Sequence, residues 1–247
     1  MKKFTFVGPL IVLLIWWIIT YIPLIKSILL PPPHTVILSL FTQLFISKEL
    51  LYPLFETLSL WLTAFIVGTV GGISSGMVMG YSDKIYSFFE VIIDFFRSLP
   101  SLLLIPIAII FFGIGNTSAF LVTTWSGFFY IFINTIYGVK YARKSYIFIT
   151  KILNIEKLKT FTEVILPASA PYIIAGLRIS LSITLIVAVG SEMILGRGGL
   201  GGKVYDAFLI YNTTEIYVII LIVGTLGYIS NKLLVLLENR VIHWKGE

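Results

Sequence analysis

Residues 140–167 have the sequence KYARKSYIFITKILNIEKLKTFTEVILP and interrupt a chain that is otherwise strongly hydrophobic. The segment is basic at its start, carries a short apolar patch in its middle, and closes on Ile165, Leu166 and Pro167. Long hydrophobic runs flank it on both sides. A Lys or Arg at the bilayer centre costs roughly 2.5–3.5 kcal/mol on insertion scales, so this segment predicts a water-exposed loop between membrane spans.

Composition places the whole chain in the membrane. Of its 247 residues, 57% are hydrophobic and 12% are charged, and the mean hydropathy is +0.98. An average soluble domain is roughly 25% charged. The net charge of +6 does not predict a nucleic-acid partner, because the Lys and Arg residues lie between hydrophobic runs. We expect membrane lipid as the surroundings, one transmembrane domain over residues 1–247, and no disulfide, since cysteine is absent.

Hydrophobic runs predict an all-α protein with about six transmembrane helices, because a bilayer core takes about 20 apolar residues per helix. The first run follows two lysines, as in a signal peptide, but it is longer than a signal core and has no small-x-small cleavage site. Thr35–Phe45 is too short to cross and predicts a surface helix after the Pro31–Pro33 break. The six runs are Phe4–Ile25, Pro53–Gly80, Ile85–Phe112, Ser118–Val139, Pro171–Leu195 and Ile216–Leu237.

The loop charges predict an orientation. With six crossings, one side receives only Lys26, Lys48, Arg197 and Lys203, and the other Lys and Arg residues of the loops fall on the opposite side. Cytoplasmic loops carry the excess of positive charge. Both termini and the loop at about 140–167 are therefore expected in the cytoplasm.

Four glycines repeat at four-residue spacing in the second run, at Gly68, Gly72, Gly76 and Gly80. One face of that helix carries almost no side chains, so another helix can approach it closely. Two interpretations are open, helix packing within one subunit and a subunit interface or moving contact.

The third run carries a polar seam. Glu90, Asp94 and Arg97 are spaced to share one helix face, and Pro100 and Pro106 should kink or divide the run. Ionisable groups in a membrane should face protein or water. The seam is either a structural ion-pair network or part of a pathway or gate.

Two further charges lie in the fifth run, Arg178 and Glu192. Their separation along a helix is about 21 Å, which is too far for direct pairing. Arg178 could serve an anion or pair with a carboxylate. Glu192 is a gate candidate, with a hydrogen-bonded structural carboxylate as the alternative.

No enzyme site emerges. Gly196–Val204 is glycine-rich but lacks the first glycine and the final hydroxyl of a phosphate-binding loop, so it predicts a flexible turn on the outer side. The sequence also lacks a zinc-helix motif, a serine elbow and a Cys/His cluster. We expect no catalytic residue, no metal and no cofactor.

The loop at 140–167 resembles the coupling loop of ABC importer permeases, whose pattern is Glu-Ala-Ala, three residues, Gly, nine residues, Ile-x-Leu-Pro. Aligned on Leu166-Pro167, the pattern places Phe148, Ile149 and Thr150 where the family has Glu-Ala-Ala, and Asn154 where it has Gly. Asn tolerates the left-handed conformation, so the turn can survive. The resemblance implies an ATPase-coupling set of Phe148, Ile149, Ile152, Leu153, Asn154, Ile155, Leu158, Phe161, Leu166 and Pro167.

Further motifs follow in the order found in the sulfonate, taurine, nitrate and bicarbonate branch of that family. They are Pro31–Val36, Arg97–Pro100, Phe112–Asn116, Phe129–Thr135, Leu166–Pro171, Gly176–Arg178, Glu192-Met193, Gly199–Gly201, Gly224–Gly227 and Glu238–Arg240. The set extends over nearly the whole chain. It is specific to the family but not to a substrate.

The resemblance implies a type I ABC importer permease in the bacterial inner membrane that works by alternating access. It implies two ABC ATPase subunits, a second permease copy or paralogue, and an extracytoplasmic solute-binding protein or lipoprotein. Its cargo would be a sulfonate-like or nitrate-like anion or a small vitamin precursor. An ion-driven secondary transporter is the alternative, since buried carboxylates such as Glu90, Asp94 and Glu192 could support one. A membrane enzyme lacks a catalytic constellation, and the polar seam disfavours a structural scaffold.

Overall fold

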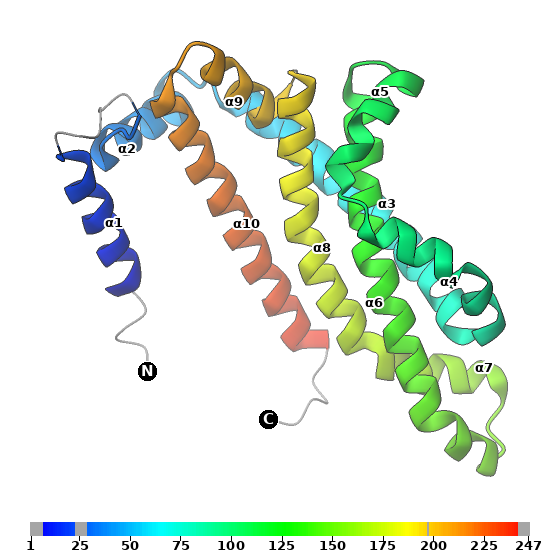
Figure 1. Ribbon diagram of the computed structural model, residues 1–247. Helices are drawn as coiled ribbons and strands as arrows, with labels where there is room; N and C mark the ends of the chain where they lie inside the picture. Colours follow the sequence, from blue (N-terminus) through cyan, green and yellow to red (C-terminus); the bar gives the residue numbers. More distant parts are fainter. Residues whose placement is uncertain (1–6, 23–28, 197, 242–247) are drawn as a thin grey trace. The chain divides into compact units, whose positions relative to one another are not determined.

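The computed structural model describes residues 7–22, 29–196 and 198–241, and within these ranges every regular element is helical (Figure 1). The α-helices are α1 (Val7–Thr20), α2 (Pro33–Phe41), α3 (Leu51–Tyr81), α4 (Asp83–Ser98), α5 (Ile105–Phe112), α6 (Asn116–Ile152), α7 (Lys157–Lys159), α8 (Leu166–Leu195), α9 (Gly199–Leu209) and α10 (Thr213–Val241). Three short elements connect them, the π-helical turns η2 (Thr42–Ile46) and η4 (Thr160–Ile165) and the 3₁₀ turn η3 (Ser101–Leu104). The expected all-α class is confirmed.

The chain divides into two compact units. One comprises Met1–Thr57 and Glu192–Thr225, and the other comprises Leu58–Ser191 and Leu226–Glu247. Helices α3, α8 and α10 each contribute residues to both units. The organisation of residues 1–247 as one transmembrane domain stays a prediction.

Four helical stretches of the described chain are long and apolar enough to cross a membrane, at Leu51–Tyr81, Asn116–Ile152, Lys157–Leu195 and Thr213–Glu238. The pair formed by Asp83–Ser98 and Ser101–Phe112 makes a fifth if it counts as one span. These correspond to the second through sixth expected crossings. The first expected crossing, Phe4–Ile25, lies partly outside the described residues. Within them it contains α1, whose 14 residues extend about 21 Å.

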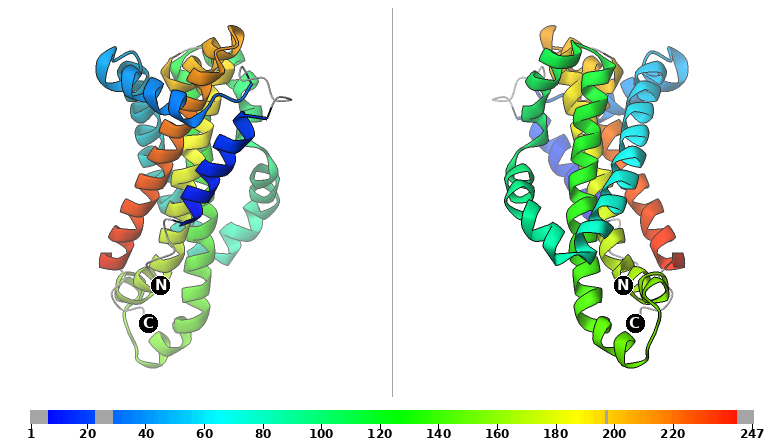
Figure 2. Two further views of the ribbon diagram at one scale, coloured as in Figure 1. Left: turned by 90° about the vertical axis from the view of Figure 1, so that its left-hand side faces the viewer. Right: turned by 90° about the vertical axis from the view of Figure 1, so that its right-hand side faces the viewer.

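The third hydrophobic run is divided as its prolines predict. Helix α4 ends at Ser98, Leu99 and Pro100 are extended, and the axis bends by 95° before α5 (Figure 2). The break lies at Pro100 because a proline disfavours helical geometry in the residue before it. Pro106 does not add a second break, since it lies in the first turn of α5, where its missing N–H has no partner to lose.

In the unit that contains Leu58–Ser191, the glycine face of α3 packs directly on α6. A Cβ at Gly68 would lie 2.8 Å from the Phe128 nitrogen, and one at Gly72 would lie 2.8 Å from the Phe128 carbonyl oxygen. A Cβ at Gly76 or Gly80 would lie 2.7 Å from the Cβ of Thr135 or Val139. The glycines therefore let two backbones approach to a distance that no other residue permits.

Helix α6 contacts α8 in the same unit through a second set of small residues. A Cβ at Gly138 would lie 2.7 Å from Tyr172 Cβ, and one at Gly176 would lie 2.8 Å from Asn134 Cβ. The Ser180 hydroxyl donates to the Gly127 carbonyl at 2.9 Å. These contacts hold α6 beside α8, as Figure 1 shows, and so fix the position of the segment that connects them.

Candidate functional site

Helix α6 does not end where its hydrophobic run ends. It continues from Val139 through the basic residues to Ile152, and its 37 residues extend about 55 Å, far beyond a bilayer core of about 30 Å. No proline interrupts residues 116–152, so nothing in the backbone stops the helix at the membrane boundary. The expected fourth crossing Ser118–Val139 and the first part of the expected loop are thus one continuous helix, in which Phe148–Ile152 form the last turn and Leu153 is the C-cap.

Helix α6 ends in a left-handed turn at Asn154, which has φ of 51°. The Ile155 N–H donates to the Thr150 carbonyl at 2.9 Å, and the Asn154 N–H donates to the Lys151 carbonyl at 3.2 Å. This pair of bonds is the Schellman motif, which normally places glycine at the left-handed position. The expectation that asparagine preserves the turn is confirmed.

The residues of the expected coupling loop divide into two groups. Phe148, Ile149, Ile152, Leu153 and Leu158 expose between 51% and 70% of their surface. Ile155, Phe161, Leu166 and Pro167 are half-buried, and the Phe161 ring packs edge-on against Tyr81 at 5.7 Å. The loop thus has an exposed apolar face, and its half-buried residues pack against the rest of the unit. We call Phe148, Ile149, Ile152 and Leu153 the "α6 tip".

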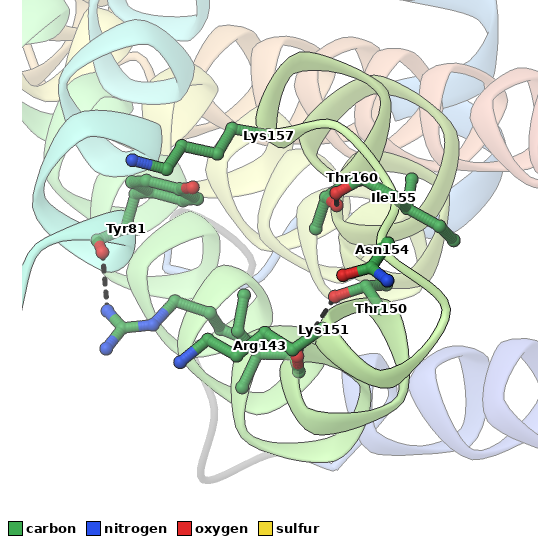
Figure 3. A pocket seen from close by; sticks show the side chains of 9 residues that line it. Tyr81, Arg143, Thr150, Lys151, Asn154, Ile155, Lys157 and Thr160 are labelled. Atoms are coloured by element: carbon green, nitrogen blue, oxygen red, sulfur yellow. Dashed lines mark hydrogen bonds between the residues drawn. The ribbon is translucent and has the colours of Figure 1, made fainter.

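A basic cavity of about 510 Å³ lies between the end of α6 and the return of the chain to α8 (Figure 3). Arg143 and Lys151 line it from α6, Lys157 lines it from α7, and Tyr81 lines it from the end of α3. Thr150 and Thr160 also line it, but their hydroxyls donate to backbone carbonyls of Ile147 and Ile155. We call this cavity the basic pocket.

Arg143 joins α6 to the corner between α3 and α4. Its guanidinium donates to the Tyr81 carbonyl and pairs with the Asp83 carboxylate. The Tyr81 carbonyl is at the C-terminus of α3, where a cation is favoured by the helix dipole. No sequence pattern identifies Tyr81 or Asp83 as a partner of Arg143, because both lie about 60 residues away from it along the chain.

In the other unit, the glycine-rich segment after α8 forms a helix. Gly196, Gly198 and Gly199 have positive φ values as expected, but α9 begins at Gly199 and the glycines at 199, 201 and 202 are buried. The expected flexible turn is therefore wrong beyond Gly198. Arg197 lies outside the described residues.

Three side chains hold the first turn of α9. The Gly199 N–H donates to Glu56 Oε2 at 2.8 Å, the Leu200 N–H to Thr57 Oγ1 at 2.8 Å, and the Gly201 N–H to Glu192 Oε2 at 3.0 Å. These amides have no partner inside the helix, and the positive end of the helix dipole favours the carboxylates. We call Glu56, Thr57 and Glu192 the "α9 anchor".

Glu192 is the central residue of this anchor. Its surface is only 4% exposed, and its carboxylate also accepts from the Thr57 hydroxyl, at 3.0 Å to Oε1 and 2.8 Å to Oε2. Glu192 is thus a hydrogen-bonded carboxylate that ties the starts of α3 and α9 to the end of α8. Of the three residues of the α9 anchor, the sequence analysis identified only Glu192 as a candidate, because Glu56 and Thr57 lie at the start of a hydrophobic run and belong to no recognisable motif.

The other membrane charges are partly paired. Arg97 lies 3.4 Å from Asp94, and its guanidinium donates to the Tyr137 hydroxyl at 3.3 Å, whereas Glu90 is exposed. Arg178 pairs with Glu238 of α10, as one of its two interpretations expects, and a role of Arg178 in the pathway stays a prediction. Among the described residues, no group of three or more His, Asp or Glu side chains is suited to a metal ion.

Exchanging the charges of the Arg178–Glu238 ion pair tests whether the pair stabilises the fold. We expect Arg178→Glu and Glu238→Arg each to lower the free energy of unfolding by about 1–2 kcal/mol, because each leaves two like charges in a half-buried place. The double variant should recover most of this loss in thermal unfolding of the detergent-purified protein. Recovery of stability without recovery of transport would instead assign Arg178 a direct role with the cargo.

Comparisons with known proteins agree with this architecture. Residues 68–243 match the profile of the family described as "Binding-protein-dependent transport system inner membrane component". The chain is 30% identical to the taurine transport system permease TauC of Escherichia coli over 98% of this chain and 90% of that protein. It is 27% identical to the putative aliphatic sulfonates transport permease SsuC of Bacillus subtilis over 96% of this chain and 86% of that protein.

A solved structure shares the fold. A chain of the methionine ABC transporter MetNI, in an inward-facing conformation, superposes with a TM-score of 0.57 at 20% identity, covering 73% of this chain and 93% of that chain. This likeness supports the helical architecture.

Several long apolar helices, together with an α6 that is longer than a bilayer core is thick, are the features of a membrane-embedded protein. The chain belongs to the family of binding-protein-dependent transport system inner membrane components. It is a multi-pass permease of an ABC importer in the bacterial inner membrane, not an enzyme, and it works with a separate ATPase and a solute-binding protein.

Proposed function

We propose that two permease subunits, identical or paralogous, enclose a pathway for a small oxyanion, and that two ATPase subunits drive it through residues 140–167. The permease termini and this segment lie in the cytoplasm, as the distribution of Lys and Arg supports. A lipoprotein or other extracytoplasmic receptor delivers the cargo.

A single observation carries the coupling proposal, the exposed α6 tip. Four large apolar side chains are exposed at the end of a helix that is longer than a bilayer core is thick, and the basic residues around them in the sequence favour a position outside the hydrocarbon core. Exposed apolar clusters in water mark interaction sites. A helix end of this kind fits the helix-in-groove mode, in which an ATPase groove takes the apolar face.

The rest of the loop supports a rigid transmission of force. Ile165 is fully buried against Val139 and Ala142, and Arg143 ties α6 to the α3–α4 corner. Movement of the α6 tip by the ATPase would thus be passed to α3, α6 and α8 together. Phe148 occupies the position of the acidic residue in the family pattern, so coupling here depends on apolar contact.

The relatives support the oxyanion class. The similar permeases are named for taurine, aliphatic sulfonates, nitrate and bicarbonate. No observation favours a vitamin precursor or an ion-driven mechanism. Because Arg178 is paired with Glu238, we assign selection of the anion to the receptor. The candidate pathway residues are Glu90, Asp94 and Arg97. Glu192 is the candidate for the outer gate.

The coupling proposal predicts that Ile152→Asp combined with Leu153→Asp abolishes ATP-driven uptake and cargo-stimulated ATP hydrolysis. Two carboxylates at the α6 tip cannot be desolvated in an apolar groove. The measurement is uptake into proteoliposomes that contain the permease, its ATPase and its receptor, together with co-purification of the ATPase.

The matched control is Ile152→Leu with Leu153→Met, which keeps the apolar face and should retain coupling. Thr162→Asp, an exposed charge outside the α6 tip, should also be tolerated. Normal uptake by the double aspartate variant at normal membrane levels would contradict docking at the α6 tip.

A further inference from the structure

An apolar groove lies beside the basic pocket. It has a volume of about 610 Å³ and runs between the end of α3 and the return of the chain through α7 and η4. Met77 and Val78 of α3, Ile85 of α4 and Phe161 of η4 line it, and Val78 exposes 58% of its surface. Its lining is mostly hydrocarbon, with Tyr81, Ser82 and Lys157 as the residues that carry polar side-chain atoms.

The groove and the basic pocket share two residues. Tyr81 and Lys157 line both cavities, so the apolar groove opens beside the cationic cavity. In Figure 3 the ends of the Arg143 and Lys157 side chains lie on the Tyr81 side of the pocket. A molecule that occupies both must therefore be apolar at one end and anionic at the other.

The charge available to such a molecule comes mainly from two lysines. Asp83 partly neutralises Arg143, whereas neither Lys151 nor Lys157 forms an ion pair with any residue that the structure describes. Two unpaired ammonium groups and a fixed guanidinium around one cavity favour an anion such as phosphate, whose oxygens accept charge-assisted hydrogen bonds. The volume of each cavity falls in the range of ligand pockets.

The position along the helices supports a lipid. Tyr81 is the last residue of a helix long enough to cross the membrane, so we expect this end of the helix near the level where acyl chains meet headgroups. Basic pockets between transmembrane helices on the cytoplasmic side are typical binding places for anionic headgroups. A soluble anion would use the basic pocket but would leave the apolar groove empty.

We propose that this double cavity binds an anionic phospholipid, with its phosphate in the basic pocket at Arg143, Lys151 and Lys157 and an acyl chain in the apolar groove at Met77, Val78 and Phe161. Binding joins the base of the loop to the bilayer, because the lipid contacts α3, α6 and α7 at once. The inference rests on the cytoplasmic placement of residues 140–167 proposed above but not on ATPase docking, and the α6 tip plays no part in it.

Native mass spectrometry of the full chain in detergent tests the proposal, with phosphatidylglycerol and phosphatidylcholine titrated as probes. We expect preferential retention of phosphatidylglycerol. Lys151→Gln with Lys157→Gln should weaken that retention about 30-fold, since each cation near an anionic lipid contributes a factor of about five. The matched control is Lys140→Gln with Lys144→Gln, which removes the same charge from a neighbouring part of α6 and should change retention less than about threefold.

A second variant separates a lipid from free phosphate. Val78→Trp fills the apolar groove and leaves the three cations in place, so it should release the phospholipid and leave any binding of inorganic phosphate unchanged. Equal retention of both lipids, or equal losses in the two lysine pairs, would overturn the proposal. The proposal would also be overturned if inorganic phosphate displaced the lipid and Val78→Trp had no effect. A third contrary result would be a Lys151 and Lys157 variant that loses ATPase binding but retains phosphatidylglycerol as the wild type does.

Discussion

Replacing Gly199 by alanine is expected to lower the free energy of unfolding by at least about 3 kcal/mol. Gly199 has φ of 55°, a conformation that costs an alanine about 1–2 kcal/mol. An added Cβ would also collide with the buried Glu192 carboxylate, and each hydrogen bond to a charged group that is lost costs about 1.5–3 kcal/mol. The thermal midpoint should fall by roughly 6–12 °C.

The matched control for this change is Gly224→Ala in α10. A Cβ at Gly224 meets nothing within 4 Å, so the only effect is the gain in helix propensity, about 1 kcal/mol in favour of alanine. Thermal unfolding of the two variants in detergent measures the difference. If Gly199→Ala were as stable as Gly224→Ala, the α9 anchor would not be rigid.

Replacing Gly76 by leucine is expected to prevent accumulation of folded permease. A Cβ at this position would lie 2.7 Å from Thr135 Cβ and 2.8 Å from the Phe132 carbonyl oxygen, and part of that wall is backbone that cannot rotate away. Gly76→Ala should lose up to about 2 kcal/mol, because overpacking costs about 1–3 kcal/mol and the gain in helix propensity offsets about 1 kcal/mol of that. Membrane level and the monodispersity of the purified protein measure the effect.

Gly71 of the same helix supplies the control. A Cβ there would lie 3.4 Å from the edge of the Phe128 ring, which is ordinary contact with a movable side chain. Gly71→Ala should therefore be neutral or stabilising by up to about 1 kcal/mol. Wild-type levels of folded Gly76→Leu would show that α3 and α6 do not pack at this distance in the membrane.

Local sequence patterns predicted a structural feature correctly wherever neighbouring residues alone determine that feature. Hydrophobic length located the second through sixth expected crossings, since burying apolar area in lipid depends on the number of consecutive apolar residues. Pro100 located the break between α4 and α5 because its effect on the preceding residue is steric. Asn154 predicted a left-handed turn for the same kind of reason.

The errors have a common physical origin. Helix α6 continues through the basic segment because charged residues are compatible with a helix in water, so the end of a hydrophobic run marks the bilayer boundary and not the helix end. Helix α9 forms from a glycine-rich segment because side chains of α3 and α8 satisfy its first amides. Neither effect is visible in a local window of residues.

By itself the sequence determined that this is a polytopic helical membrane protein with a basic, water-exposed segment before α8. Tertiary structure alone decided that Arg143 joins the α3–α4 corner, that Arg178 pairs with Glu238, and that Glu56, Thr57 and Glu192 meet at α9. The physical reason is distance along the chain. Membrane insertion depends on consecutive residues, whereas the pairing of a buried polar group depends on which distant residue the fold brings within about 3 Å.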